Sequence, residues 1–272
     1  MLQLDRGRGM RFLVDELEAR GYSWAYRVVD TQAFGLPQRR QRVVLLASKT
    51  DDPREVLFAD DAEPQLPAFS RDLWCGFYWT EGLRGLGWAV DAVPTLKGGS
   101  TIGIPSPPAI WNPKADAIFT PDIRDAERLQ GFPAGWTEEA LASSGIRPGH
   151  RWKLVGNAVS VPMATWVGKR LAKLGVFDNA RLLDAVRAGV SWPRAASGGP
   201  GVEPRQVRVT MWPVAVRRPH LSEFLLHGTT ALSHRAAAGF LSRAKKGSLH
   251  FEEGFIAAVQ RQVLRMKRAT AA

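Results

Sequence analysis

The stretch FGLPQRRQRVVLLAS, from Phe34 to Ser48, decides the fold. Its second part, from Arg42 to Ser48, is an apolar run rich in branched residues and predicts a strand. A second β-prone run, from Trp24 to Asp30, precedes it, and the connection between the two holds Gly35 and Pro37. That connection is too long for a tight hairpin and too short for a helical crossover. We therefore expect two antiparallel strands, joined by a loop that carries a specific function.

The loop presents an arginine cluster to one side. Alternate residues of an extended segment share a face, so Gln38, Arg40 and Arg42 are expected on one side and Arg39 and Gln41 on the other. Two guanidinium groups are thereby aimed at one place. Such a fork suits phosphate or a base carbonyl oxygen, and a permanently charged donor suits an oxygen that gains negative charge in a reaction. Taken alone, the cluster fits equally an arginine-rich strand end that pairs with carboxylates or solvent.

The same string is similar to the Gln-x-Arg-x-Arg motif of the DNA cytosine-5 methyltransferases, with its preceding Gly-x-Pro. Two later stretches resemble the family's last two motifs, in the family's order. RDAERLQGFP, from Arg124 to Pro133, resembles the helix and turn that organise the target-recognition lobe, where Glu127 and Arg128 are expected to tie the helix to neighbouring loops. VGNAVSVP, from Val155 to Pro162, resembles the Gly-Asn motif at the start of the final catalytic helix.

The resemblance implies roles for individual residues. Arg40 and Arg42 would orient a cytosine flipped out of the duplex and stabilise charge at its O2. Asn157 and Ala158 would face the methionine end of S-adenosylmethionine, because a Gly-Asn pair ahead of a helix presents backbone N–H groups to a carboxylate. An ordinary helix N-cap is the local alternative. Glycines and hydroxyls approach a phosphate backbone, and the expected DNA contacts are Gln38, Arg39, Lys97, Gly98, Gly99 and Ser100.

The cysteine that the resemblance requires is not in its place. The family's reaction needs a thiolate to attack C6 of the base before S-adenosylmethionine gives its methyl group to C5. The only cysteine, Cys75, follows Trp74 instead of Pro, and it lies after the Arg motif instead of well before it. We therefore expect a packed or loop thiol. The Gly-rich cofactor loop and the Glu-Asn-Val glutamate are also absent from the sequence, and a single cysteine predicts neither a disulfide framework nor a Cys-rich metal site.

In the family, the Arg-motif strand and its predecessor are the last two strands of a seven-stranded sheet. Two strands alone are marginal in water, and the apolar run from Val43 to Leu46 would lack most of its cover. We therefore expect a split enzyme, in which an N-terminal methyltransferase subunit supplies the cofactor loop and the nucleophilic cysteine. The alternative is a catalytically inactive DNA-binding remnant.

The expected fold class is α/β: the C-terminal part of a Rossmann-like methyltransferase sheet, an irregular target-recognition lobe and a helical C-terminal extension. Apolar spacing and capping residues predict helices at 10–21, 122–130, after Thr137, at 161–174, and within 221–226, 236–241 and 255–266. The expected segments are 1–50 (end of the catalytic domain), 51–121 (recognition lobe), 122–177 (last motifs and closing helix), 178–207 (linker) and 208–272 (basic helical extension).

The charge is uneven along the chain. Lys and Arg total 37 against 26 acidic residues, giving +11, and residues 178–272 hold fifteen basic and six acidic residues. Such a surplus favours double-stranded DNA as the partner, whereas the regular apolar spacing in 208–272 favours a helical cap with solvated faces. The sequence has no uncharged apolar run near twenty residues and a charged start unlike a secretory signal. We expect a cytoplasmic protein of a restriction-modification system, with no membrane contact.

Overall fold

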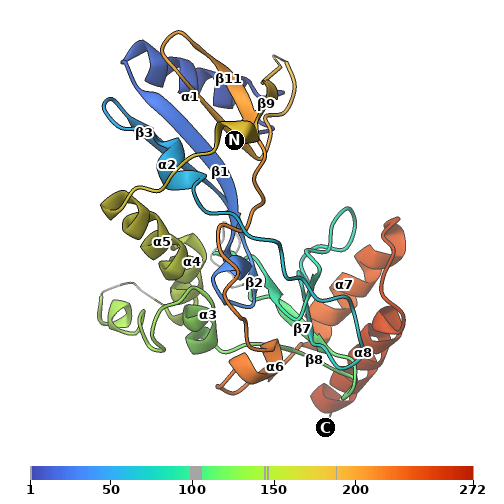
Figure 1. The fold of residues 1–272 in the computed structure, drawn as a ribbon. Helices are drawn as coiled ribbons and strands as arrows, with labels where there is room; N and C mark the ends of the chain where they lie inside the picture. Colours follow the sequence, from blue (N-terminus) through green and yellow to red (C-terminus); the bar gives the residue numbers. More distant parts are fainter. Residues whose placement is uncertain (1, 99–105, 144, 146, 188, 272) are drawn as a thin grey trace. The chain divides into compact units, whose positions relative to one another are not determined.

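The structure, a computed structural model, describes residues 2–98, 106–143, 145, 147–187 and 189–271 (Figure 1). It is mixed α/β, and the chain divides into two compact units, each made of three separate segments. Unit 1 comprises Met1–Phe34, Gln41–Gln65 and Pro162–Val216, and unit 2 comprises Gly35–Arg40, Leu66–Val161 and Arg217–Ala272. The units do not follow the five segments expected from the sequence, because the chain passes repeatedly from one unit to the other and no local pattern marks those passages.

Unit 1 is built on an antiparallel sheet in the order β3-β1-β10-β11-β9. Its strands are β1 (Ser23–Asp30), β3 (Gln41–Ser48), β9 (Leu182–Ala185), β10 (Ala195–Gly199) and β11 (Val202–Val207). The expected antiparallel pairing of the first two is confirmed, with Trp24 opposite Ala47 and Asp30 opposite Gln41. The expected isolation of this pair and the linker over residues 178–207 are wrong, because those residues form η3 (Asn179–Arg181) and the strands that continue the sheet beyond β1.

The glycines of residues 195–201 explain why this stretch has the composition of a linker. A Cβ atom on Gly198 would lie 2.6 Å from the Trp24 ring, and one on Gly199 would lie 2.8 Å from the Ser23 Oγ. Gly201, in the turn between β10 and β11, has a φ of +70°, which favours glycine. Here glycine allows close packing of strands and a tight turn.

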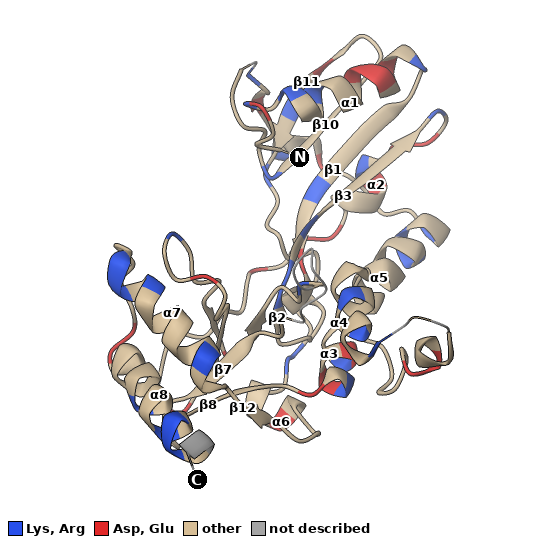
Figure 2. Cartoon of the chain, turned by 180° about the vertical axis from the view of Figure 1, so that it is seen from behind, with Lys and Arg blue, Asp and Glu red and all other residues tan. Residues whose placement is uncertain are grey.

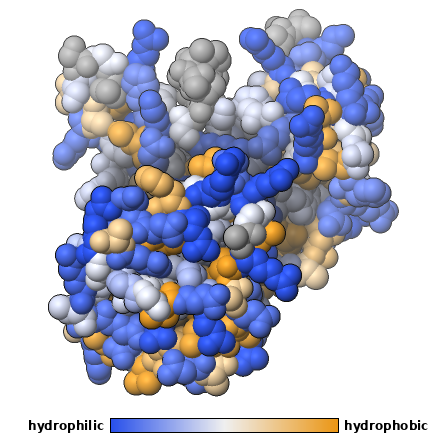
Figure 3. All heavy atoms as spheres, turned by 90° about the horizontal axis from the view of Figure 1, so that it is seen from above, coloured by the Kyte–Doolittle hydropathy of each residue, from blue (hydrophilic) through white to orange (hydrophobic). Residues whose placement is uncertain are grey.

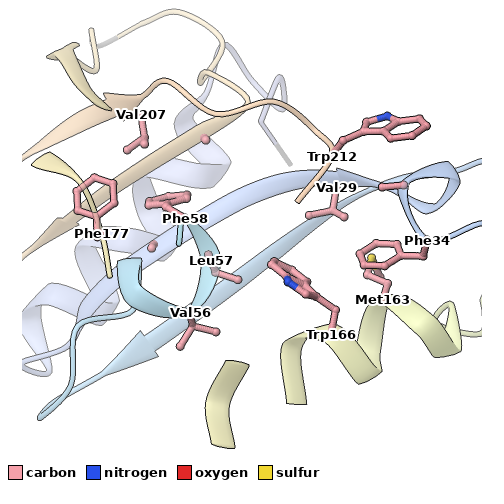
Figure 4. Packing of buried hydrophobic residues seen from close by; sticks show 13 residues of the cluster. Val29, Phe34, Val56, Leu57, Phe58, Met163, Trp166, Phe177, Val207 and Trp212 are labelled. Carbon is pink, nitrogen blue, oxygen red and sulfur yellow. The ribbon is translucent and has the colours of Figure 1, made fainter. Parts of the chain in front are cut away.

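Helices cover both faces of this sheet. On one face, α1 (Arg8–Ala19) packs Met10 and Val14 against Trp24 and Tyr26. On the other, α2 (Arg54–Leu57) and α5 (Val161–Ala172) pack against β1. The rings of Trp166 on α5 and Phe34 have centroids 6.0 Å apart, and Figure 4 shows Trp166 pointing from α5 toward the strands, beside Leu57. The helices expected at 10–21 and 161–174 are thus confirmed, and a short 3-10 helix, η1 (Thr31–Ala33), follows β1.

Unit 2 holds a second antiparallel sheet, in the order β12-β8-β7-β4-β5, and a separate parallel pair, β2 with β6. The strands are β2 (Gln38–Arg39), β4 (Cys75–Phe77), β5 (Ala89–Val90), β6 (Val93–Pro94), β7 (Ala109–Asn112), β8 (Ala117–Thr120) and β12 (Thr230–Ala231). The lobe expected to be irregular therefore has a sheet at its centre. All seven of these strands are two to four residues long, too short for an alternating pattern to be recognised.

Helices also cover both faces of the second sheet. On one side, α7 (His234–Lys246) and α8 (Phe255–Ala271) pack on Cys75, Phe77 and Trp111. On the other lie α3 (Ile123–Leu129), α4 (Pro148–Asn157) and α6 (Leu221–Phe224). The C-terminal helices are confirmed, whereas the helix expected after Thr137 is only a short 3-10 turn, η2 (Glu139–Ala142). Within the described residues, no helix is both long and apolar enough to cross a membrane.

Candidate functional site

The Arg motif enters unit 2 as β2, which runs parallel to β6 with Gln38 opposite Val93 and Arg39 opposite Pro94. Burial alternates along the motif as predicted: Gln38 and Arg40 are buried, Arg39 and Gln41 are exposed, and Arg42 is half-buried. Arg40 belongs to unit 2 and Arg42 to unit 1. The alternation is confirmed, and the convergence of the two guanidinium groups stays a prediction.

Gln38 joins the Arg motif to two other segments. Its Nε2 donates to the Leu129 carbonyl oxygen at 2.7 Å, and its Oε1 accepts a hydrogen bond from the Leu96 N–H at 3.1 Å. Beside it, Gln130 Nε2 donates to the Val155 carbonyl oxygen at 2.9 Å. Because Gln38 is fully buried and hydrogen-bonded at both ends of its amide, it holds these segments together, and the DNA contact expected of it does not fit this position.

Arg40 makes a second connection among the same segments. Its side chain is 2% exposed, and its guanidinium donates to the carbonyl oxygens of Leu96 at 3.3 Å, Gly156 at 3.1 Å and Ala158 at 2.7 Å. A buried charge requires such compensation, and a guanidinium has enough donors to bind several carbonyl groups at once. Arg40 therefore positions the three segments, and its expected contact with a base stays a prediction.

The Gly-Asn pair lies at the end of a helix. Gly156 and Asn157 close α4, and α5 begins only at Val161, so the expected presentation of N–H groups at a helix N-terminus by this pair is wrong. A Cβ atom on Gly156 would lie 2.5 Å from the Gly98 nitrogen, which explains the glycine. Asn157 is exposed and Ala158 half-buried.

Two of the expected DNA-contacting cations come together on the surface. Thr95 Oγ1 donates to the Arg39 carbonyl oxygen at 3.0 Å, and the Tyr78 hydroxyl donates to the Thr95 carbonyl oxygen at 2.9 Å. The Lys97 ammonium group lies 3.5 Å from the centroid of the Tyr78 ring and pairs with Glu81. Arg39 and Lys97 are both exposed. Gly98 is half-buried beside them, and the expected contacts Gly99 and Ser100 lie outside the described residues.

A buried ionic network supports the motif on α3. Glu127 is fully buried and accepts hydrogen bonds from the Gly135 and Thr137 N–H groups and from Arg151 at 2.9 Å. Burial alone would raise the pKa of Glu127, but the hydrogen bonds from Thr137 and Arg151 lower it. Arg128 donates to Asp125 at 2.8 Å and to the Phe224 carbonyl oxygen. The expectation that Glu127 and Arg128 tie the helix to neighbouring loops is confirmed.

Cys75 is a packed thiol, as expected. It is fully buried in β4, between Val90 of β5 and Trp111 of β7. Burial raises its pKa to about 12. Because the thiolate is the nucleophilic form, Cys75 is unreactive near neutral pH.

Tyr78, Thr95 and Arg151 carry much of this arrangement, and the contacts that they make were not expected from the sequence. Thr95 and Tyr78 lie among short strands with no readable period, and Arg151 lies on α4, which was not expected. Pro148 at the start of α4 was the available indication, since proline is favoured in the first turn of a helix.

Comparison with known proteins finds a matching family and several relatives. A sequence model of the family described as C-5 cytosine-specific DNA methylase matches residues 1–72. The chain is 45% identical over 270 residues to the Type II methyltransferase M2.BsuMI of Bacillus subtilis (strain 168), covering 96% of this chain and 68% of that protein. It is 45% identical over 51 residues to M.BsuFI of Bacillus subtilis, covering 19% of this chain and 12% of that protein.

A more distant relative matches a longer segment. The Type II methyltransferase M.NgoBI of Neisseria gonorrhoeae is 26% identical over 181 residues, covering 58% of this chain and 54% of that protein. This chain thus spans only part of the length of each of these relatives, about half in the case of M.NgoBI. By its long match to M2.BsuMI and the family match over residues 1–72, the chain belongs to the C-5 cytosine-specific DNA methylase family.

Proposed function

We propose that this chain is the C-terminal part of a DNA cytosine-5 methyltransferase, which transfers methyl from S-adenosylmethionine to C5 of a cytosine flipped out of duplex DNA. The observation that carries the proposal is the buried junction of Gln38 and Arg40. Through it, the Arg motif is hydrogen-bonded to the end of α3, to Leu96 and to the end of α4. Three stretches that resemble methyltransferase motifs are thus packed together in a relative of methyltransferases.

The two arginines have different roles in this proposal. Arg42 is half-buried and its Nη1 donates to the Gln41 carbonyl oxygen at 2.9 Å. We assign to Arg42 the contact with O2 of the flipped base, where a permanently charged donor stabilises negative charge as it develops. Arg40, held by three carbonyl groups of unit 2, positions the segments of that unit. Arg39, Lys97 and the adjoining Gly98, Gly99 and Ser100 would contact the DNA backbone.

Asn157 and Ala158 are the proposed contacts to S-adenosylmethionine, which supplies the methyl group. The Asn157 amide is exposed and makes no hydrogen bond within the described residues. The nearby Ser160 hydroxyl is buried and likewise has no hydrogen-bond partner among them. Both are uncharged polar groups suited to the ammonium and carboxylate groups of a methionine moiety, so the segment fits the cofactor.

The nucleophile comes from outside these 272 residues, because they contain one cysteine and that cysteine is buried. We propose that it comes from a separate N-terminal methyltransferase subunit. Unit 1 offers a place for such a partner along β3, which forms the edge of its sheet. The strand's Val43 is 39% exposed, and an edge strand has free backbone groups that pair with an added strand.

Both helical layers beside β3 also leave apolar side chains exposed. Phe12 on α1 is 70% exposed, and Leu171 on α5 is 52% exposed, with Leu174 just beyond at 41%. A cavity of about 270 Å³ runs between β3 and α5 and is lined in part by Leu46, Ala47, Pro53, Val56, Leu171 and Leu174. Orange apolar groups also lie among hydrophilic ones on the face drawn in Figure 3. A partner that adds a strand to β3, with helices on both faces, would cover Phe12, Val43, Leu171 and Leu174.

The test is reconstitution of methyl transfer from S-adenosylmethionine to duplex DNA. The chain alone should transfer no methyl group, and mixing it with an N-terminal subunit that carries the cofactor loop and the catalytic cysteine should restore transfer. Arg42→Ala should abolish the restored activity by removing the charge at O2, whereas the control Cys75→Ala should retain it. Robust methylation by the isolated chain would contradict the split enzyme.

A catalytically inactive DNA-binding remnant is the second candidate, and the observation that favours it is the buried, unreactive Cys75. Duplex binding by the lone chain with a steep salt dependence, unchanged by S-adenosylmethionine and by any N-terminal subunit, would support the remnant.

A further inference from the structure

The two C-terminal helices carry charge of one sign only. Neither α7 nor α8 contains Asp or Glu, whereas both contain several Lys and Arg residues, shown in blue in Figure 2. Like charges one helical turn apart destabilise a helix, and an ordinary solvated face mixes both signs. Arg261 and Arg265, one turn apart on α8, share a single carboxylate, that of Asp116. The stability of the fold therefore does not account for helices whose charged residues are all basic.

The C-terminal end of α7 is fastened to the loop formed by residues 78–87. Arg243 donates from Nε to the Glu81 carbonyl oxygen at 2.9 Å and from Nη2 to the Trp79 carbonyl oxygen at 2.7 Å. A Cβ atom on Gly247 would lie 2.6 Å from the Leu83 carbonyl oxygen, so the two backbones are in close contact. The end of α7 is thus held in a defined position against this loop.

The same loop leads to the expected DNA contacts. Glu81, whose carbonyl group binds Arg243, pairs through its carboxylate with Lys97, and Lys97 lies over Tyr78. Tyr78 in turn reaches Arg39 through Thr95. All of these residues belong to unit 2. A continuous series of contacts therefore connects Arg39, the exposed cation of the Arg motif, to the end of α7.

Three exposed cations extend this series. Lys245 and Lys246 lie in the last turn of α7, and Arg84 lies in the loop beneath it. None of the three has an ion pair within the described residues. The acidic groups nearest in sequence are Glu81, already paired with Lys97, and Glu252 and Glu253, which precede α8. The exposed side chains at this end are thus cations without a local counter-charge.

We propose that Arg84, Lys245 and Lys246 form a phosphate-binding extension of the surface that begins at Arg39 and Lys97, and that it contacts the DNA backbone beside the recognised site. This inference rests on the proposed function, since the polyanion is the duplex substrate. Duplex DNA carries about one negative charge per 1.7 Å of its axis, and cations that neutralise phosphates release condensed counterions. Lysines that contact phosphate position the duplex and read no sequence.

Cations in the last turn of a helix also interact favourably with the helix dipole, without any ligand. The far end of α8 provides a matched control for that effect, because Lys267 and Arg268 are also exposed and also lie near a helix C-terminus. At 1.5 Å per residue, Lys267 lies about 18 Å along the α8 axis from Phe255, at the end of α8 opposite to its connection with α7. A dipole effect would be equal in the two pairs, whereas a phosphate contact would be confined to the first.

The experiment measures binding of the full chain, alone and with its N-terminal subunit, to a labelled duplex of about three helical turns at several salt concentrations. Lys245→Gln/Lys246→Gln should weaken binding by about 10-fold or more near 0.1 M salt and lower the slope of log K against log[salt] by about 2. Lys267→Gln/Arg268→Gln should leave both quantities unchanged. Melting temperatures of the two variants should be lowered by similar, small amounts.

Two results would overturn the inference while leaving the proposed function intact. One is wild-type binding by the Lys245→Gln/Lys246→Gln variant, which is also what an acidic protein partner at this surface would give. The other is an equal loss in both variants, which would indicate a general effect of net charge. Failure of the wild-type chain to bind any duplex, with or without the subunit, would instead reject the proposed function and the inference together.

Discussion

The two units differ in the length of the strands at the edges of their sheets. In unit 2, helices pack on both faces of the sheet, and buried polar side chains such as Gln38 and Glu127 find their partners within the unit. In unit 1, helices also cover both faces, yet the edge strand β3 and apolar residues on α1 and α5 stay exposed. The sheet of unit 2 ends in β5 and β12, of two residues each, whereas the eight-residue β3 of unit 1 is long enough to pair with the partner strand that we propose.

The difference indicates which substitutions should reduce stability and which should reduce association with a partner. Buried ion pairs are costly to break, because the remaining partner is left without compensation, whereas an exposed apolar residue contributes little to the fold that exposes it. Disrupting the networks of unit 2 should therefore reduce stability, and altering the exposed patch of unit 1 should reduce association alone.

Arg151→Ala should have the largest effect on stability. It removes the cation that pairs with fully buried Glu127 at 2.9 Å, and loss of one partner from a buried pair costs about 3–5 kcal/mol. Urea denaturation of the full chain measures the change. As a control, Arg124→Ala removes an exposed pair with Asp122, which should change the free energy of unfolding little because solvent screens such a pair. Equal losses of unfolding free energy in the two variants would show that the buried Glu127 network contributes no more to stability than a surface ion pair.

Acid should destabilise the chain through the same carboxylates. Burial alone would raise the pKa of both Glu127 and Asp125, but hydrogen bonds, from Thr137 and Arg151 to Glu127 and from His227 to Asp125, lower them below the ordinary values of 4.5 and 3.8. Their contribution is present in full above the ordinary pKa and is lost as pH falls from there through the lowered pKa. Urea midpoints from pH 7 to pH 3 measure this. A midpoint that is constant below pH 4.5 would contradict it.

Leu171→Asp should have the smallest effect on the chain itself and a large effect on its association. The side chain is 52% exposed, so the free energy of unfolding should change by only about 0.5 kcal/mol. A charge placed beside β3 should nevertheless prevent binding of the N-terminal subunit, measured by calorimetry. The matched control is Leu264→Asp, 58% exposed on α8 in unit 2. Unimpaired binding by Leu171→Asp would remove this face from the proposed interface.

Local patterns predicted those parts of the fold that local forces determine. The antiparallel pair β1 and β3, and the helices α1, α5, α7 and α8, were expected because their sequences have the apolar content or spacing of a strand or helix over six or more residues. The strands β9 to β11 were missed because their glycines were taken for flexibility. Gly198 is required by the ring of Trp24, far away in sequence, and no local rule reveals that contact.

The sequence predicted which residues belong to the candidate site, but it did not predict most of the contacts that they make. The alternation of burial along Gln38 to Arg42 followed from the period of an extended chain. The engagement of Arg40 by Gly156 and Ala158 did not, because those carbonyl groups lie over a hundred residues away. The Gly-Asn pair was placed on the wrong helix for a similar reason, since α4 begins in a stretch of Gly, Pro and Arg that lacks an apolar period.

The interleaving of the two units bears on how the protein is made. The chain passes between the units five times, and each unit needs three separate segments. On the ribosome, β1 emerges early, but one of its two edges stays unpaired until β10, more than 160 residues later, has been synthesised. Contacts between such distant segments slow folding. During synthesis the apolar Val28–Val29 segment therefore stays exposed for many seconds. We expect the yield of folded protein in cells to depend on chaperones that shield such nascent strands.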